Sequence, residues 1–520
     1  MASAEAFLEA IIANPDDDAP RLMYADWLEE QGDTAQAEFI RVQIALARMG
    51  AEDERRLELT KREGILRLAN QEKWLGEHAG LFVDRKVGTE DRGRYSISAQ
   101  MILRGFWRGA RFERGLLEGI YFPEPVLAEH ADALLRRWPI REIGVDNLAR
   151  DRVPALVVSP WLKRLSTLVV TGDLSAGGVA ELTSSPHLSG LRELVLVGAR
   201  IGPEGTIDLT RSPLKSLRVL CLRGNDIGAA GVEGLARWAQ LSGLTSLDLS
   251  ENGIGTVGVE ALCSSPHLGR LTHLKLRDNW FDSGGARAIA RTEQLTDLQE
   301  LDLDRNNLGE DGVEQLAASP YLSNLHMLSL GATHCGRAGA RALAGSPVVR
   351  SLTFLNLARN LLGPEGAISL GRSSHLSCLR ILDLGDNAIG NEGVQGLVNS
   401  PIFGKVITLS LANTRLTVFG VKALTRSTAL KSLQKLLLNE NRLDYRAAQV
   451  LARWPGIAQL KYLSLSSNRI GDEGAKALAS SIYVGRIGRL DMRRNQITAE
   501  GLAAIKAAGL TNVYVGRPEL

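Results

Sequence analysis

The residue types that could do covalent chemistry in this sequence form a row: Ser246, His273 and Glu300, each 27 residues after the one before. A serine, a histidine and a carboxylate within hydrogen-bonding reach can act as nucleophile, general base and orienting group. Such a site also needs a sharp turn that presents the serine and an oxyanion hole, and the sequence shows neither signature. We therefore expect the row to arise from a repeated pattern, and we expect the protein not to be an enzyme.

Other signatures of catalytic or cofactor sites are missing from the sequence. It contains no phosphate-binding glycine loop, no His-Glu-x-x-His motif, no Gly-x-Ser-x-Gly elbow and no dinucleotide fingerprint. The four cysteines, Cys221, Cys263, Cys335 and Cys378, have neither zinc-ligand spacing nor the density of a disulfide framework. We expect no catalytic residue, no cofactor and no metal site, and we expect a reducing compartment.

The composition is typical of a soluble globular protein. Of the 520 residues, 44% are hydrophobic and 23% are charged, and the formal net charge is +2, so charge gives no reason to expect a nucleic-acid or membrane partner. The N-terminus carries acids where a secretory signal needs bases, and no apolar run approaches the roughly 20 residues that span a bilayer. We expect a cytoplasmic protein without a membrane segment.

A repeated segment decides the predicted architecture. It reads Leu-x-x-Leu-x-Leu-x-x-Asn, followed by an apolar residue, a glycine and the run Gly-Val-x-x-Leu-Ala. A fixed period of this length is typical of a solenoid, in which each unit contacts only its neighbours. Thirteen clear copies, 26 or 27 residues apart, begin at Leu165, Leu191, Leu217, Leu244, Leu271, Leu298, Leu325, Leu352, Leu379, Val406, Leu433, Leu460 and Ile487.

Each part of the repeat has a structural role. The last two leucines of the first motif alternate with outward residues, which is typical of a strand with one buried face. The asparagine after the strand, such as Asn306, can donate to and accept from the backbone of a stacked neighbour, so we expect an asparagine ladder. Because a helix is wider than a strand, stacking predicts an α/β horseshoe with a parallel sheet on its concave face and helices on its convex face.

The chain divides into three predicted parts. Residues 1–50 form a small α-helical module, with Ser3 as the cap of the first helix, and residues 51–115 form a connector that starts as a charged helix. Residues 116–520 form the horseshoe. Its parts are two degenerate capping repeats at Leu117–Phe122 and Ile140–Val145, the thirteen clear repeats, and a C-terminal cap strand after Leu510.

The repeat resembles the ribonuclease-inhibitor class of leucine-rich repeats, which is shared with Ran GTPase-activating proteins and innate-immune receptors. The leucine positions, the asparagine, both glycines and the repeat length carry this resemblance, whereas the many cysteines of ribonuclease inhibitors are missing. The resemblance implies a binding horseshoe, and it places no functional residue in this sequence.

The N-terminal module is similar to the repeat-companion domain found at the N-terminus of many bacterial repeat proteins. The run NPDDDAPRLMYADWLEEQGD from Asn14, followed by AEFIRVQ, carries the similarity. That family accompanies repeat arrays, and the resemblance implies no activity. The acids Asp16, Asp17 and Asp18 could suggest a metal site, but we expect helix caps and a solvated acidic face.

The connector ends in an Arg- and Gly-rich stretch over residues 85–114. Aromatic residues interleave with its bases, a pattern that superficially resembles a nucleic-acid-binding patch. We favour a mobile loop or a strand pair that docks the helical module, and nucleic-acid binding stays an alternative. The basic and aromatic residues include Arg92, Arg94, Tyr95, Arg104, Phe106, Trp107, Arg108 and Arg111.

The repeat leaves the concave positions beside the strand leucines free to vary. Apolar side chains such as Met327, Phe354 and Ile381 lie there among mixed charges, which is typical of a protein-binding site. The alternative is simple solvation, in which lateral pairs such as Arg277 with Asp304 contribute about 0.2–1 kcal/mol each. We predict that a protein partner contacts Asp248, Glu251, His273, Lys275, Arg277, Glu300, Asp302, Asp304, Arg305, Met327, Phe354, Asn356, Arg359, Ile381, Asp383, Asp386, Tyr462, Arg489 and Arg493.

Two further surfaces could make contacts. The early strands offer an apolar concave patch that includes Val169 and Val195. Trp138, Trp238 and Trp454 directly follow helices of the repeats, where we expect loop packing and keep a convex contact site as the alternative.

These observations predict a non-enzymatic protein-binding scaffold that uses its concave face. The mixed charges favour a protein partner over nucleic acid, which prefers a uniformly basic groove. One alternative is that the protein inhibits or regulates a partner enzyme, GTPase-like or nuclease-like, as the proteins it resembles do. The other is nucleic-acid binding through residues 85–114.

Overall fold

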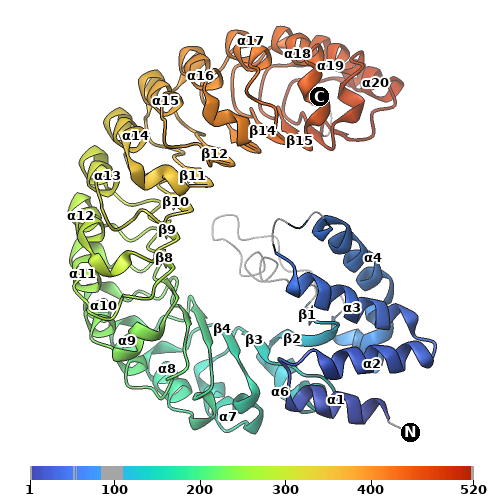
Figure 1. Ribbon diagram of the computed structural model, residues 1–520, viewed down its shortest axis with the longest axis vertical. Helices are drawn as coiled ribbons and strands as arrows, with labels where there is room; N and C mark the ends of the chain where they lie inside the picture. The colour runs from blue at the N-terminus through green and yellow to red at the C-terminus, as the bar shows by residue number, and fades with distance from the viewer. Residues whose placement is uncertain (1–2, 51–52, 54, 83–108, 517–520) are drawn as a thin grey trace. The chain divides into compact units, whose positions relative to one another are not determined.

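The computed structural model describes residues 3–50, 53, 55–82 and 109–516. The chain forms two compact units. The first unit comprises Met1–Ile201 with Arg211–Cys221, and the second comprises Gly202–Thr210 with Leu222–Leu520. In Figure 1 the chain runs from blue at the N-terminus to red at the C-terminus, so the second unit begins in green.

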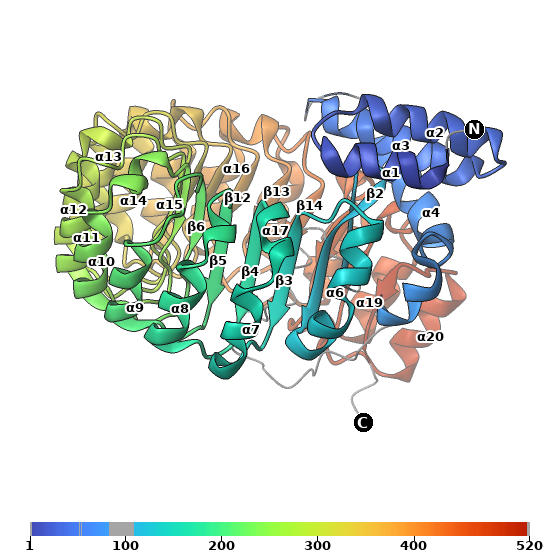
Figure 2. The ribbon, with the colours of Figure 1, turned by 90° about the horizontal axis from the view of Figure 1, so that it is seen from below.

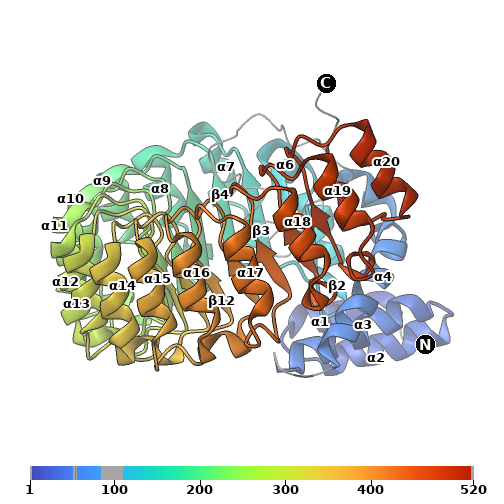
Figure 3. The same cartoon turned by 90° about the horizontal axis from the view of Figure 1, so that it is seen from above.

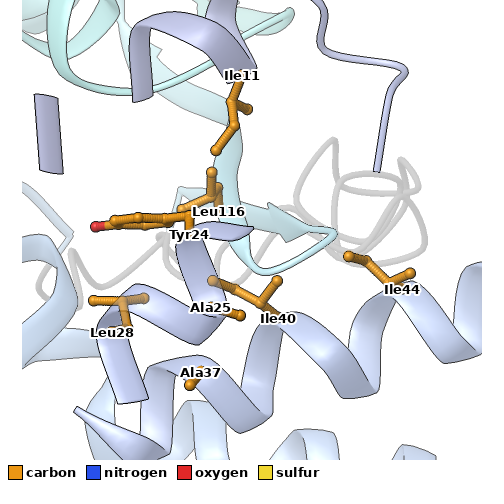
Figure 4. Close-up of a cluster of buried hydrophobic side chains, with 8 residues drawn as sticks. All are labelled: Ile11, Tyr24, Ala25, Leu28, Ala37, Ile40, Ile44 and Leu116. Atoms are coloured by element: carbon orange, nitrogen blue, oxygen red, sulfur yellow. The ribbon is translucent and has the colours of Figure 1, made fainter. Parts of the chain in front are cut away.

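The first unit begins with the predicted helical module. Ser3 caps its first helix, because its side chain accepts a hydrogen bond from the Ala6 amide. The core of the module also includes Leu116, which lies in the strand β2, so the module packs directly on the start of the sheet (Figure 4). The helices are α1 (Ala4–Ala13), α2 (Ala19–Glu30), α3 (Thr34–Arg48) and α4 (Arg56–Leu75). The core side chains are Ile11, Tyr24, Ala25, Leu28, Ala37, Ile40, Ile44 and Leu116.

A buried ion pair fastens the module to the sheet. Arg21 on α2 is fully buried, and its Nη2 donates to Oε1 of Glu118 at 2.6 Å and to the carbonyl of Pro15 at 2.8 Å. Burial raises the pKa of Glu118 to about 7, although the nearby positive charge of Arg21 acts to lower it. If one residue of such a buried ion pair is replaced, the other charge stays buried without a partner, and the fold is strongly destabilised.

The acidic run before α2 serves caps and ion pairs. Asp17 accepts from the Ala19 amide at 2.9 Å, whereas Asp18, the N-cap residue of α2, makes no capping hydrogen bond with its side chain. Asp16 pairs with Arg141 at 2.6 Å, and this hydrogen bond lowers the pKa of Asp16. Asp18 pairs with Arg48 at 2.6 Å. The predicted solvated acidic face is therefore largely a set of ion pairs to arginines.

An antiparallel hairpin joins the connector to the sheet. Gly115 forms its turn with a φ of 89°, and its amide donates to Gln43 on α3 at 2.7 Å. A Cβ at this position would lie 2.2 Å from Ile40, so only glycine fits the approach to α3. This antiparallel hairpin of β1 and β2 matches the strand pair expected to dock the module.

The rest of the first unit is a parallel sheet with helices after its strands. β2 pairs with β3, β3 with β4, β4 with β5 and β5 with β6, all in parallel. The predicted degenerate repeats correspond to β2 and β3. The strands are β1 (Ala110–Glu113), β2 (Leu116–Pro123), β3 (Glu142–Asp146), β4 (Thr167–Thr171), β5 (Glu193–Val197) and β6 (Val219–Cys221). The helices are α6 (Glu124–Arg137), α7 (Val153–Val157) and α8 (Ser175–Thr183).

The second unit repeats one strand, one turn and one helix. Its strands pair in parallel along the inner side of an arc, and its helices lie along the outer side (Figure 1). The strands are β7 (Ser246–Asp248), β8 (His273–Lys275), β9 (Glu300–Asp302), β10 (Met327–Ser329), β11 (Phe354–Asn356), β12 (Ile381–Asp383), β13 (Thr408–Ser410), β14 (Lys435–Leu437), β15 (Tyr462–Ser464), β16 (Leu490–Asp491) and β17 (Val513–Tyr514).

The helices of the second unit stand side by side as one layer (Figures 2 and 3). They pack over the strand leucines, such as Leu247 and Leu249, which are fully buried. They are α9 (Gly202–Leu209), α10 (Gly228–Ala236), α11 (Gly255–Cys263), α12 (Ser283–Arg291), α13 (Gly309–Ala317), α14 (Gly336–Gly345), α15 (Gly363–Gly371), α16 (Gly390–Val398), α17 (Val418–Arg426), α18 (Tyr445–Ala452), α19 (Gly471–Ala479) and α20 (Ala499–Ala507).

The predicted asparagine ladder is present. The Oδ1 of Asn306 accepts from the Asn279 amide at 2.9 Å, and its Nδ2 donates to the carbonyls of Leu276 and Leu303 at 2.9 and 3.0 Å. Asn279 makes the equivalent bonds one repeat earlier. Thr333 replaces the asparagine in the next repeat, and its hydroxyl donates only to the carbonyl of its own strand, Leu330, and to Asn360.

A second ladder runs along the loops after the helices. The Ser319 hydroxyl donates to the carbonyl of Ala290 at 2.6 Å, at the end of the helix one repeat earlier. Ser373 and Ser427 bond to Ala344 and Val398 in the same way. These serines therefore satisfy a carbonyl at the end of the neighbouring helix, a role that the repeat pattern alone did not reveal.

Candidate binding face

The strand face opposite the helices carries four rows of variable side chains in the second unit. The paired residues lie directly opposite each other: His273 faces Glu300, and Lys275 faces Asp302. Exposure alternates around a buried leucine in strands such as β8 and β9, as predicted, whereas a buried serine follows the leucine in β10, β13 and β15. The rows are numbered here from the start of the strand.

The nineteen predicted contact residues all fall in these rows, and each row takes one position of the repeat. The first row holds His273, Glu300, Met327, Phe354, Ile381, Tyr462 and Arg489. The second row holds Asp248, Lys275, Asp302, Asn356 and Asp383. The third row, after the last leucine, holds Arg277, Asp304 and Arg493. The fourth row, before the ladder position, holds Glu251, Arg305, Arg359 and Asp386.

An apolar stripe lies in the first row. Met327 faces Phe354, and Phe354 faces Ile381, in the parallel register of β10, β11 and β12. All three side chains are partly exposed. Three large apolar residues side by side on an open sheet remain in water unless something covers them, and this exposure has a free-energy cost that binding would remove.

Asp304 departs from the predicted role, because it is buried in a polar network. Its carboxylate accepts from Arg277 at 2.7 Å, from the Ser329 hydroxyl at 2.6 Å and from the Gly331 amide at 2.6 Å. A Cβ on Gly331 would lie 3.0 Å from this carboxylate. Because glycine has no side chain, Asp304 has room to pack against the sheet surface. Asp304 thus orients Arg277 and is not itself a surface for a partner.

Asp302 lies beside this network, and its electrostatics are unusual. Burial and the nearby charge of Asp304 raise the pKa of Asp302 to about 6. Asp248, which lies two strands away in β7, raises the pKa of Asp302 further, while Arg277 lowers it. The second row therefore offers a carboxyl that gains a proton just below neutral pH.

The row of Ser246, His273 and Glu300 is aligned by strand register, but its side chains do not have the geometry of a catalytic triad. Ser246, His273 and Glu300 face one another across β7, β8 and β9. The His273 Nε2 lies 3.5 Å from Glu300, and its Nδ1 lies 2.8 Å from the Thr272 hydroxyl. Both ring nitrogens face other partners, so neither is placed to accept a proton from Ser246.

Cations and aromatic rings alternate at the last strands. The Arg489 guanidinium lies 4.1 Å from the ring centroid of Tyr514 and 6.0 Å from that of Tyr462. The Lys435 ammonium lies 5.6 Å from the Tyr462 ring. Such contacts hold the arginine in place between two rings. Tyr514 was missed from the sequence because it lies in the cap strand, outside the clear repeats.

The fourth row has an unusual backbone. The four residues directly before the ladder positions have φ between 54 and 61°, in the left-handed region: Glu251, Arg305, Arg359 and Asp386. The turn fixes this conformation, and it directs these side chains to one edge of the face. Arg359 there pairs with Asp386 at 3.0 Å, a lateral pair of the predicted kind on an exposed surface.

The early apolar patch differs from its prediction. Val169 and Val195 lie in the first unit and are almost fully buried. Tyr121, Val197 and Cys221 pack against them. The neighbouring side chains therefore close over this patch, and it offers little exposed apolar surface.

The Arg-rich stretch lies mostly outside the described residues. Of the bases named for the nucleic-acid alternative, the structure describes Arg111, which pairs with Glu113 at 2.6 Å and also with Glu142. Within the described ranges, no cluster of three or more His, Cys, Asp or Glu side chains is arranged to hold a metal ion. In the same part of the chain, no helix has the length and apolar character to cross a membrane.

A family model described as Leucine Rich repeat matches the sequence. The matched segments are residues 214–236, 242–263, 271–290, 294–317, 350–371, 375–398, 459–479 and 489–506. They coincide with strands and helices from β6 onward. No curated protein matches the sequence.

Several solved structures are similar at low identity. An internalin from Listeria monocytogenes is 18% identical over 76% of this chain and 95% of that one, with a TM-score of 0.37. The mouse RP105/MD-1 complex is 16% identical over 73% and 76%, with a TM-score of 0.39. The yeast complex of Rad7 and Elc1 is 14% identical over 66% and 82%, with a TM-score of 0.41. The repeat geometry and the family match together show that the chain carries leucine-rich repeats stacked as a solenoid.

Proposed function

We propose that the protein is a non-enzymatic scaffold that binds a protein partner with the strand face of its second unit. The observation that carries this proposal is the apolar stripe of Met327, Phe354 and Ile381, aligned by strand register and partly exposed. Charged residues surround it, as they do in the polar rim of protein interfaces. Large apolar anchors within a polar rim supply most of the binding energy of such interfaces.

The charge mixture supports a protein partner. Lys275 and Arg277 lie beside Asp302 and Glu300, whereas a nucleic-acid site would present one sign of charge along the backbone path. A stable complex needs about 800 Å² on each partner, and a sheet face of this many strands offers that area. The early strands contribute less, because their apolar side chains are covered.

The resemblance to the ribonuclease-inhibitor class supports a finer version of the proposal. In this version the partner is an enzyme, GTPase-like or nuclease-like, and the concave face inhibits or regulates it. Residues 1–50 act as a companion module that caps the array, and residues 51–115 connect the two. None of the four cysteines is joined in a disulfide, which supports a cytoplasmic location.

Affinity capture with paired variants tests the proposal. The variant Phe354→Ala with Ile381→Ala removes two members of the stripe. The control, Val257→Ala with Ile482→Ala, removes two strongly exposed apolar side chains that lie outside the strands. We expect a protein captured by the wild type and the control to be lost from the stripe variant, with affinity reduced roughly thirtyfold for an anchor worth about 2 kcal/mol.

Three results would contradict the proposal or its details. Equal capture by both variants would place binding away from the stripe. Recovery of nucleic acid instead of protein would favour the Arg-rich residues 85–114. Turnover of a captured substrate that is lost with His273→Ala, in a folded variant, would show an enzyme.

A further inference from the structure

The helix side of the second unit carries a groove between α17 and α18, which stand next to each other (Figure 3). The groove has a volume of about 590 Å³. Phe419 on α17 and Trp454 after α18 supply aromatic surface, and Phe419 is 66% exposed. Its cations are Lys422, Arg426, Arg446 and Arg453, and none of the lining side chains, all of them described, is acidic.

The repeat pattern does not account for two of these residues. The residue before the second glycine of the repeat lies in the first helical turn, where several repeats place an acid that favours the positive end of the helix dipole. α17 has Phe419 at this position, and α18 has Arg446. A base at a helix N-terminus is electrostatically unfavourable, so the fold alone gives no reason for it. The acids at the equivalent positions are Glu204, Asp311, Glu365, Glu392, Glu473 and Glu500.

The cations of the groove are not neutralised by neighbouring acids. Among the described residues, none of the four forms an ion pair with a carboxylate. Arg446 contacts Tyr445 instead, with Nε 3.2 Å from the hydroxyl. Asp444, the N-cap residue of α18, uses its carboxylate to cap the helix through the amides of Arg446 and Ala447. Lys476 on the next helix differs, because it lies 2.9 Å from Glu473 and 2.7 Å from Glu500.

The helices on either side limit the length of an anionic ligand. α16 carries Glu392 in its first turn, and α19 carries Asp472 and Glu473. These acids would repel a long polyanion such as nucleic acid, which needs a continuous basic track. A short segment avoids them. The exposed Phe419 ring adds an apolar contact that a purely ionic ligand would not use.

We propose that the groove between α17 and α18 binds a short acidic peptide segment of a protein partner, with an apolar side chain of that segment on Phe419. The four cations provide charge complementarity for several carboxylates. Trp454 forms part of the groove while it packs the loop, so the predicted loop role and the alternative contact role both apply to it. This site lies on the helices and does not depend on the strand face.

Fluorescence anisotropy with a defined probe tests the proposal. The probe is a fluorescein-labelled decapeptide of eight glutamates around a central pair of leucines, and the reference peptide replaces the glutamates with glutamines. We expect the full-length protein to bind the probe, to bind the reference peptide much more weakly, and to lose affinity as salt rises. Phe419→Ala should weaken binding of this probe more than that of a decapeptide of glutamates alone.

Matched charge reversals localise the site. We expect Arg446→Glu to weaken probe binding about tenfold, which corresponds to about 1.4 kcal/mol. The control is Arg341→Glu, the same charge change on the exposed side of α14, and it should leave affinity unchanged. Both side chains are exposed, so circular dichroism should show both variants folded.

Clear outcomes would overturn the proposal. It fails if the probe does not bind, or if Arg341→Glu weakens binding as much as Arg446→Glu. It also fails if a ten-nucleotide oligothymidine binds as tightly with the same dependence on Arg446, because the groove would then bind polyanions in general. The Phe354→Ala with Ile381→Ala variant should still bind the probe, so failure of the strand-face proposal remains distinguishable.

Discussion

The asparagine ladder makes a prediction that can be worked bond by bond. Asn306→Ala removes the only acceptor of the Asn279 amide and the only donor to the Leu303 carbonyl that the described residues provide. The Leu276 carbonyl keeps a partner, because Asn279 also donates to it at 3.0 Å. Two buried backbone groups are therefore left without partners.

The matched substitution one repeat earlier breaks one short and one long hydrogen bond to the backbone. Asn279→Ala removes the acceptor of the Asn252 amide at 2.9 Å and of the Ile254 amide at 3.5 Å, and the second bond is too long to contribute much. The Leu249 carbonyl keeps Asn252, and the Leu276 carbonyl keeps Asn306, both at 2.9 Å. The two substitutions remove the same side chain from equivalent, buried positions, so the loss of packing cancels in the comparison.

The difference between the two variants gives the magnitude. A buried backbone group without a partner costs about 1–3 kcal/mol, and a carbonyl costs less than an amide. We expect Asn279→Ala to destabilise by about 1–2 kcal/mol and Asn306→Ala by about 2–3 kcal/mol. Asn306→Thr should recover about half of the loss, since the Thr333 hydroxyl already reaches the carbonyl of Leu330 at 2.7 Å.

Urea unfolding followed by circular dichroism measures the free energy of unfolding of the three variants. Hydrogen exchange adds a local test, because the Asn279 amide should lose protection in Asn306→Ala while the Asn252 amide keeps it. Equal destabilisation by the two alanine variants would refute the bond count. Unchanged stability in both would refute the ladder as a source of stability.

Three other predictions follow from the backbone and the buried charges. Gly115→Ala should destabilise the first unit by at least about 2 kcal/mol, because its methyl would lie 2.2 Å from Ile40 at a φ of 89°; in the same urea assay, Gly64→Ala, which meets nothing within 4 Å, should not destabilise. Ala332→Gly should stabilise by about 0.5 kcal/mol in thermal melts, since relief of left-handed strain exceeds the added entropy of the unfolded chain; a lower melting temperature would contradict this. The pKa of Glu118 is raised from 4.5 to about 7 in the folded protein, so its contribution to stability is full below pH 4.5 and is lost as pH rises through about 7. Urea titrations across this range should show that Glu118→Gln removes part of the decline, and an identical pH profile would show that Glu118 does not cause it.

Much of the fold could be predicted because each repeat encodes it locally. The strand leucines, the asparagine and the helix recur with one spacing, so one unit such as Leu298–Ala317 is enough to define strand, turn and helix. Stacking then follows from the need to bury the leucines. A strand pair was one of two expectations for the connector, but its turn was not placed, because the geometry of the β1–β2 hairpin depends on the contact between Gly115 and Ile40, which are distant in sequence.

The candidate site was predictable in position but not in exposure. The alternation along each strand places Phe354 and Asp304 on the same face. Whether a side chain there is free depends on its lateral neighbours. Asp304 is buried because Gly331 lacks a side chain, and Val195 is covered because the large side chain of Tyr121 packs against it. Those pairs come from different repeats, so a repeat-by-repeat reading does not reveal them.

The asparagine ladder also bears on how such an array can change in length. Each ladder bond joins one repeat to the next through groups that nearly every repeat possesses, such as the Asn360 amide and the Asn387 side chain at 2.9 Å. Duplication or loss of a whole unit would therefore rejoin compatible donors and acceptors, whereas loss of a few residues would misalign them. The same event would bring strands that were two units apart into contact. Gene rearrangement by whole units could then create a new binding surface in one step while leaving the interior bonding intact.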